Sequence, residues 1–272
     1  MSIKSLKKQL MAAIAMVLVA AVALGSSTYA WFASNNTVTA TDVSVTAQSD
    51  ARFLEITTLG TNFTGSTITK AALNAGSVDP TSGLYPVTPF KLTATDKTGT
   101  VGTDLSVSGD VLTWSYTYSD TVANYAKGSE QEWKTVGASG NHTLAESAVF
   151  NDFYFRTTVE GVTGTNLKAT AADFGSIDTD SIDEGVTVLL AGTDGYQVIT
   201  SDGTITSYDN TGKVDPDAVL VNTVSNVAVD AVSSASKVTV YVFYNGENTN
   251  VTTQKLASIA GVTVASITFG ID

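Results

Sequence analysis

The chain has 272 residues, a formal net charge of −12, no cysteine and only 15% charged residues. This length suits one large β domain or two small ones and allows a substantial core. The acidic balance disfavours binding to nucleic acid and to anionic lipid. The lack of cysteine excludes disulfides, thiolate metal sites, a cysteine nucleophile and a lipid anchor on cysteine.

Residues 1–30 have the three parts of a secretory signal peptide. Lysines precede an apolar run at residues 10–25, and Thr28 and Ala30 occupy the −3 and −1 positions of a cleavage site. The run is shorter than the roughly 20 apolar residues of a membrane-spanning helix. We therefore expect a signal peptidase to cut after Ala30, which removes three lysines, takes the net charge from −12 to −15 and leaves no membrane attachment.

The mature chain then begins with Trp31 and Phe32, which form an exposed aromatic end. The sequence after them is rich in Thr, Val and Asn and is typical of a strand. A free strand of this kind is unfavourable in water, whereas the open edge of a sheet can accept it through backbone hydrogen bonds.

The apolar residues of this segment change from even-numbered to odd-numbered positions near Thr41 and Asp42. Val38 and Ala40 share one parity, and the apolar residues of 43–47 share the other. Two explanations stay open. Either a β-bulge lies here, or the first half pairs with another subunit while the second half belongs to the chain's own sheet.

Alternating β-branched and aromatic residues predict many short strands after residue 48. Residues 111–118 (VLTWSYTY) place their large side chains on one face and predict a half-buried strand. Residues 237–244 (KVTVYVFY) are apolar on both faces, which predicts a central strand. The further predicted strands are 52–58, 153–159, 185–191, 195–200, 203–208, 219–229 and 261–269.

A hairpin and a few short helices complete the predicted elements. Asp202-Gly203 predicts a two-residue hairpin turn with positive φ at both residues. The segments 165–174 and 252–260 have short helical patterns, and Thr143 and Glu146 have the spacing of a capping box. Three of the four prolines lie in residues 79–90, which predicts a loop or the boundary of an insertion.

These elements predict an all-β fold, namely a jelly-roll-like antiparallel β-sandwich with insertions and one or two short helices. The expected organisation is a cleaved signal peptide (1–30), an N-terminal donor-type strand (31–48) and a β-sandwich domain with insertions (49–272).

Two parts of the chain resemble a known family. The sequence GSSTYAWFASNNTVTATDVSVTA at the signal junction, and SKVTVYVFYNGENTN followed by LASIAGVTVASITF near the C-terminus, resemble TasA/camelysin-type secreted proteins of Gram-positive bacteria, which carry a SipW-dependent type of signal peptide. The resemblance implies a jelly-roll subunit that assembles into extracellular fibres or biofilm matrix. It also implies that residues 31–40, with Trp31, Phe32, Val38 and Ala40, complete the sheet of the next subunit.

The implied partners are copies of the same chain, in a homopolymer, and a related minor subunit. The implied location is extracellular or at the cell surface. Some camelysin-type members have been described as metalloproteases, but this chain has no zinc motif, so that activity is not carried over.

The sequence offers little for catalysis, and we expect no enzyme activity and no cofactor. His142 is the only histidine, so no second imidazole and no thiolate can join it at a metal. HExxH, P-loop and GxSxG patterns are absent. Acidic pairs in residues 178–185 and 208–218 remain, but glycosidase chemistry needs two carboxylates that face each other across a cleft.

The acidic residues of 208–218 suggest a second interpretation. An EF-hand alignment fails because Ala218 stands where the bidentate glutamate belongs. A looser calcium site formed by Asp209, Asp215 and Asp217 is the weak alternative to solvated turns.

Three further function classes compete with the fibre subunit. One is a secreted adhesin or glycan-binding module, in which exposed aromatic residues stack on sugar rings. The second is a secreted hydrolase that uses acidic residues, and the third is an S-layer or sheath protein of the cell surface. The aromatic candidates for sugar stacking, for each of which packing in the core is the favoured interpretation, are Trp114, Tyr116, Trp133 and Tyr208.

Overall fold

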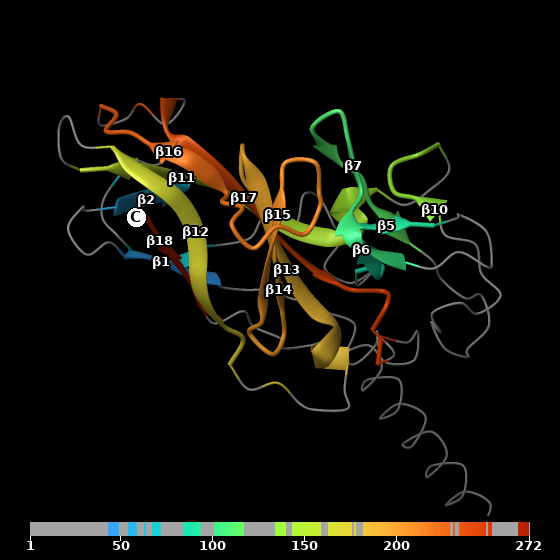
Figure 1. Ribbon diagram of the computed structural model, residues 1–272. Helices are drawn as coiled ribbons and strands as arrows, with labels where there is room; N and C mark the ends of the chain where they lie inside the picture. The colour runs from blue at the N-terminus through green and yellow to red at the C-terminus, as the bar shows by residue number, and fades with distance from the viewer. Residues whose placement is uncertain are drawn as a thin grey trace, which may run out of the picture.

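The computed structural model of this chain describes strands between residues 43 and 270 (Figure 1). The described residues are 43–48, 54–58, 63, 67–71, 84–93, 101–116, 134–139, 143–158, 163–175, 177, 182–228, 231, 234–248, 250–251 and 266–271. Within them, the longest helical segments are two short 3₁₀ turns, η1 (Leu144–Glu146) and η2 (Ile182–Gly185). The predicted all-β class is confirmed.

One layer of the sandwich is a six-stranded antiparallel sheet. Its central strand β17 (Ser236–Tyr244) pairs with β13 (Val186–Ala191) on one side and with β11 (Ala148–Thr157) on the other. Beyond β13 lie β14 (Gly195–Thr200) and then β15 (Ile205–Asp209), and beyond β11 lies β2 (Leu54–Thr58). The two terminal strands of this sheet are therefore β15 and β2.

The opposite layer is a five-stranded sheet in the order β16-β12-β18-β1-β3. These strands span Val221–Val224, Gly164–Asp173, Ser266–Gly270, Val43–Gln48 and Thr67–Ala71. β1 and β18 run parallel, whereas the other neighbours in the sheet run antiparallel. The first described strand, β1, is therefore an interior strand of the sheet, between β18 and the terminal strand β3.

Chain crossings give the sandwich its jelly-roll-like character. From β15 to β18, each successive strand lies in the other sheet, as do β11, β12 and β13 in turn. The first and last strands are neighbours, as in a jelly roll, but they pair in parallel. The β-sandwich predicted from the sequence is confirmed, with this one parallel pair among antiparallel ones.

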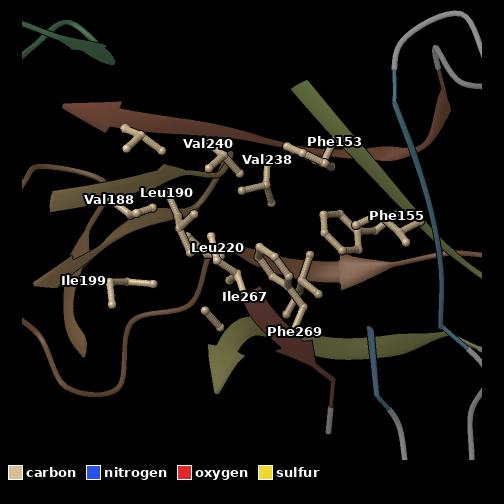
Figure 2. Packing of buried hydrophobic residues seen from close by; sticks show 14 of the residues in the cluster. Phe153, Phe155, Val188, Leu190, Ile199, Leu220, Val238, Val240, Ile267 and Phe269 are labelled. Carbon is tan, nitrogen blue, oxygen red and sulfur yellow. The ribbon is translucent and has the colours of Figure 1, made fainter. Parts of the chain in front are cut away.

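The main hydrophobic core fills the space between the two sheets (Figure 2). Phe153, Leu190 and Val240 enter from the six-stranded sheet, and Phe269 enters from the five-stranded sheet. All four are fully buried. The rings of Phe155 and Phe269 lie with centroids 4.8 Å apart, an aromatic contact that joins the layers.

A third layer covers the outer face of the six-stranded sheet (Figure 1). It consists of residues 84–139 as far as they are described, and it begins where three prolines predicted an insertion boundary. Its strands are β4 (Val87–Thr88), β5 (Phe90–Leu92), β6 (Val101–Leu105), β7 (Val107–Ser108), β8 (Val111–Leu112), β9 (Ser115–Tyr116) and β10 (Lys134–Thr135).

This layer explains why residues 237–244 are apolar on both faces. Val240 belongs to the main core, whereas Phe243 belongs to a second core beneath the third layer, together with Trp114, Tyr116 and Leu189. The indole ring of Trp114 meets the ring of Phe243 edge-on at a centroid distance of 4.9 Å. The predicted central strand is confirmed.

Two local predictions are corrected by the structure. The segment 165–174, predicted as a short helix, lies almost wholly in β12, where pairing with β16 and β18 overrides the helix propensity of its Ala, Leu and Lys residues. Residues 111–118 do not form one continuous strand, because β8 and β9 are separate and only residues 111–116 are described. Segment 252–260 lies outside the described residues.

Two other predictions concern turns. The predicted hairpin at 195–209 is confirmed, but its turn has three loop residues, because the amide of Thr200 donates to the carbonyl of Thr204 and the amide of Gly203 donates to the carbonyl of Thr200. Gly203 alone has positive φ there, at 83°, which matches a type I turn followed by a G1 bulge. The capping box is confirmed, since the Glu146 carboxylate accepts a hydrogen bond from the Thr143 amide at 2.7 Å.

A buried amide side chain links the two sheets through the core. Gln197 on β14 is 2% exposed. Its Oε1 accepts a hydrogen bond from the backbone N–H of Ala169 on β12 at 2.7 Å, and its Nε2 donates to the hydroxyl of Ser207 at 3.2 Å. The ladder between β12 and β18 shifts register between Ala169 and Ala171. Gln197 therefore satisfies a backbone group at a bulge, which would otherwise be buried without a partner.

We predict that Gln197→Met lowers the free energy of unfolding by about 1–3 kcal/mol, because the buried amide of Ala169 loses its acceptor. Urea denaturation followed by circular dichroism measures this loss. Asn210→Ala is the control, since it removes an exposed amide from the surface. Equal midpoints for the two variants would show that the Gln197 bridge contributes nothing to stability.

Candidate functional site: the edges of the two sheets

The terminal strands are the candidate site, because an unpaired strand edge presents N–H and C=O groups to which another strand can add. The six-stranded sheet ends in β15 and β2, and the five-stranded sheet ends in β16 and β3. In each sheet, one terminal strand has backbone contacts beyond its ladder, and the other is paired with a single described strand.

The outer edge of β15 is covered by the residues that follow it. Tyr208 and Val214 form an antiparallel bridge. The amide of Asp209 donates to the carbonyl of Lys213 at 2.9 Å, and the amide of Asp215 donates to the carbonyl of Ser207 at 3.0 Å. Because these bonds occupy the edge groups of β15, the short segment 213–215 closes this edge to further strands.

The turn that returns the chain to β15 is built by the Asp209 carboxylate. Its Oδ1 accepts hydrogen bonds from the Thr211 hydroxyl at 2.7 Å, from the Thr211 amide at 2.8 Å and from the Lys213 amide at 3.0 Å. These bonds, chiefly that of the Thr211 hydroxyl, lower the pKa of Asp209. The carboxylate therefore has a local structural role.

Asp215, a second calcium candidate, has the same structural use, and Asp217, the third, takes part through its backbone amide. The Asp215 carboxylate accepts a hydrogen bond from the amide of Asp217 at 3.0 Å, which closes a second small turn. Within the part of the chain that the structure describes, no three His, Cys, Asp or Glu side chains are grouped so that they could hold a metal ion. The structure thus places Asp209, Asp215 and Asp217 in turns and does not bring them together as ligands.

Gly212 connects this turn to the third layer. Its carbonyl accepts a hydrogen bond from the Leu105 amide at 2.7 Å. Its φ is +83°, and a Cβ at this position would lie 2.7 Å from the carbonyl oxygen of Leu105 and 2.9 Å from a methyl group of Val107. Both the backbone conformation and the close approach therefore require glycine.

Residues of other elements contact the backbone of β16. The Asp194 carboxylate accepts a hydrogen bond from the amide of Asn222 at 2.8 Å, and the amide of Asp194 donates to the carbonyl of Leu220 at 3.0 Å. The hydroxyl of Ser236 donates to the carbonyl of Thr223 at 3.2 Å. Consecutive residues of a strand direct their backbone groups to opposite sides, so one of the contacts at Asn222 and Thr223 lies on the outer side of β16. An incoming strand would have to displace that contact.

The other two terminal strands, β2 and β3, lie near each other on one side of the sandwich. Among the described strands, none pairs with the outer edge of either. β2 is fixed to β11 by the buried Arg156, whose Nε donates to the Glu55 carboxylate at 2.6 Å and whose guanidinium lies 4.5 Å from the ring centroid of Phe63. No described strand therefore stands in the way of strand addition at β2 or β3, whereas β15 and β16 have contacts that an added strand would displace.

The aromatic residues considered for sugar binding are buried. Trp114 is 5% exposed, Tyr116 is 2% exposed and Tyr208 is 4% exposed. They pack in the second core, as the favoured interpretation of the sequence expects, and they do not form an exposed stacking platform. Trp133 and His142 lie outside the described residues.

Burial also changes the acidity of the tyrosines. It raises the pKa of Tyr208 to about 12, and the negative charge of Asp104 acts in the same direction. It likewise raises the pKa of Tyr196 and Tyr241, with smaller contributions from Asp110 and Asp152 respectively. These three side chains lie in or against the second core, so this region favours the neutral phenol over the phenolate.

The acidic residues of 182–185 also hold loops together. A carboxylate oxygen of Glu184 accepts a hydrogen bond from the side-chain amide of Asn250 at 2.6 Å, and its backbone carbonyl accepts hydrogen bonds from Asn248 and Ser201. The structure does not describe residues 178–181. Glu184 thus joins three loops at one end of the sandwich.

The remaining predicted site residues fall outside the described part of the chain. They are the cleavage positions Thr28 and Ala30 and the donor residues Trp31, Phe32, Val38 and Ala40. Of the expected N-terminal strand 31–48, the described portion is β1, which belongs to the chain's own five-stranded sheet. None of the helices in the described residues is long and apolar enough to cross a membrane.

Sequence reasoning did not identify the residues that close the strand edges. Asp194 stands in a Thr-Asp-Gly turn and Asp209 in an Asp-Asn-Thr-Gly turn. These turn signals were visible, but the edge that each turn covers depends on strand order, which a single sequence does not display.

Comparison with known proteins finds no matching family model, no matching curated protein and no matching solved structure.

We predict that Gly212→Ala lowers the free energy of unfolding by more than the roughly 1–2 kcal/mol that positive φ alone costs a residue with a Cβ. Gly137→Ala is the matched control, because Gly137 has φ +79° and open space around its Cβ position. Thermal and urea denaturation of both variants measure the difference. Equal losses would contradict the close approach to Leu105.

We also predict that stability falls as pH rises above about 10. The unfolded chain loses its tyrosine protons near pH 10, whereas folded Tyr208 keeps its proton up to about pH 12. Between these values the unfolded state binds fewer protons, so alkali favours unfolding. Urea midpoints measured from pH 8 to pH 12 should be level at first and then decline.

Tyr208→Phe is the matched variant for this test. It retains the ring that packs near Phe90, at a centroid distance of 6.4 Å, but it has no ionisable hydroxyl. The alkaline decline should therefore be shallower than in the parent protein. Identical pH profiles for the two proteins would refute the assignment to Tyr208.

Proposed function

We propose that this protein is a non-enzymatic secreted structural subunit of extracellular fibres or biofilm matrix, which assembles when residues 31–40 of one copy add as a strand to the next copy. The partners in this proposal are copies of the same chain and a related minor subunit. The resemblance of the chain's ends to TasA/camelysin-type proteins supports it.

The observation that carries the proposal is the position of β1. Val43 pairs with Ala71 of β3, and Ser44 pairs with Ser266 of β18, so the chain enters a strand that is paired on both sides at its first described residue. Any donor segment before residue 43 is thus attached to a rigid element. A rigid attachment preserves the direction of the donor relative to its own subunit, which an ordered polymer requires.

The two ends of the five-stranded sheet have different roles in such a polymer. The segment before β1 departs at the end where Ser266 and Asp173 are paired. The C-terminal strand finishes at the opposite end, where Gly270 is paired with Gln48 and Lys168. A donor leaves at one end, so copies stacked with the same orientation form a head-to-tail contact, which generates a filament when the rotation does not close.

The treatment of the strand edges also supports assembly by strand addition. The outer side of β15 is bridged by Val214, and β16 has contacts with Asp194 and Ser236. Such contacts would suppress unspecific aggregation at these two strands while leaving β2 and β3 for a specific partner. The net charge of −15 expected after cleavage adds mutual repulsion that keeps subunits soluble before assembly.

We predict that the mature chain beginning at Trp31 forms regular filaments when the monomer is concentrated, and that deletion of residues 31–40 leaves a folded monomer. Negative-stain microscopy and light scattering detect the filaments, and circular dichroism checks the fold. A variant with residues 31–40 replaced by a Gly/Ser sequence of equal length controls for chain length. Filaments formed by the deleted chain would sink the proposal.

A further inference from the structure

We infer that the acceptor for the donor segment, residues 31–40 of a second copy, is the outer edge of β3. This inference rests on the proposed function and specifies which of the four terminal strands takes part. Three features of the described residues lead to it, namely the contacts of β15 and β16, the strand directions and the length of the link before β1.

The contacts of β15 and β16 disfavour these two strands. β15 is bonded at Ser207 and Asp209 to residues 213–215, and one of the contacts of β16 with Asp194 and Ser236 lies on its outer side. Addition at either strand would require breaking hydrogen bonds that already exist. β3 carries no such bridge to another described strand.

The strand directions favour β3 within the five-stranded sheet. β3 is antiparallel to β1, whereas β16 runs in the same direction as β1, because β12 lies antiparallel to both β16 and β18 and β18 is parallel to β1. In a head-to-tail stack, a donor that continues straight into β1 of its own subunit keeps the direction of β1. It would therefore meet the neighbour's β3 antiparallel and the neighbour's β16 parallel, and the antiparallel ladder is the more stable per residue.

The short link before β1 favours a second copy over the chain's own β3. Thr41 and Asp42 separate residue 40 from Val43, so the link reaches about 10–11 Å when fully extended. β1 already occupies the inner edge of β3, and the outer edge lies two strand spacings from β1, or about 9.6 Å. A fully stretched link leaves no length for passing around the end of β3. A donor that comes from a neighbouring subunit can reach the outer edge of β3 without passing around the end of this strand.

A β-bulge in β3 limits which strands can pair with its outer edge. The ladder between β1 and β3 shifts between Val43 and Val45, so that Thr69 and Lys70 stand opposite Ser44 alone. A bulge in a terminal strand twists its edge and weakens pairing with an arbitrary strand. The donor must therefore follow the bend of β3, which restricts acceptance to a segment with a fitting register.

Cysteine cross-linking in the full mature chain tests this inference, because the native chain has no cysteine and each engineered pair is the only source of disulfide. One chain carries a single cysteine in the donor, scanned over residues 33–39. A second chain carries a single cysteine in a terminal strand, either T69C in β3, T58C in β2 or T223C in β16. Equal amounts are mixed, assembled and oxidised, and the products are analysed on a non-reducing gel.

The expected result is a reducible dimer of the two chains with T69C at one or two donor positions, and loss of that product with T223C. A dimer formed with T58C or T223C in place of T69C would overturn the assignment to β3. A chain that carries both a donor cysteine and T69C, and that forms its disulfide as a monomer, would also overturn it.

Microscopy of the same samples distinguishes a failure of the β3 assignment from a failure of the fibre proposal. Filaments without a T69C cross-link at any donor position would reject β3 as the acceptor and leave the fibre proposal intact. Absence of filaments in every sample, including the chain without cysteine, would instead reject the proposed function.

Discussion

Burial of the six-stranded sheet on both faces is the constraint on which the rest of the structure depends. β17 directs Val238 and Val240 into the main core and Phe243 into the second core. Because neither face can be left in water, the chain must supply two covering layers. The five-stranded sheet provides one layer and residues 84–139 provide the other. The insertion is thus part of the hydrophobic core, and it shields the aromatic face of β17 and β13.

With both faces of the six-stranded sheet buried, its strand edges present the polar backbone groups that another chain could contact. Near β15 and β16, Asp209 and Asp194 accept backbone hydrogen bonds. Among the carboxylates that suggested catalysis or calcium binding, those of Asp209 and Asp215 form turns and that of Glu184 joins two loops.

The positions of many strands, and the faces on which their side chains are buried, could be predicted from the sequence. The alternation of apolar and polar residues along a strand depends directly on which face is buried. The apolar residues on both faces of 237–244 predicted a central strand, and Asp202-Gly203 predicted a hairpin. The sequence pattern did not reveal that residues 165–174 form β12, since Ala and Leu favour a helix locally and only the distant strands β16 and β18 make a strand more stable. The closing of β15 by Val214 was equally hidden, because it depends on a tertiary bridge.

The parallel pairing of β1 with β18 has a consequence for the timing of folding. β18 lies between β12 and β1, so the five-stranded sheet stays in two pieces until residues 266–270 are available. The pair joins positions more than two hundred residues apart in the chain, and such non-local contacts slow folding. A chain that emerged from a pore with its N-terminus first would have no closed sandwich until residues 266–270 had emerged.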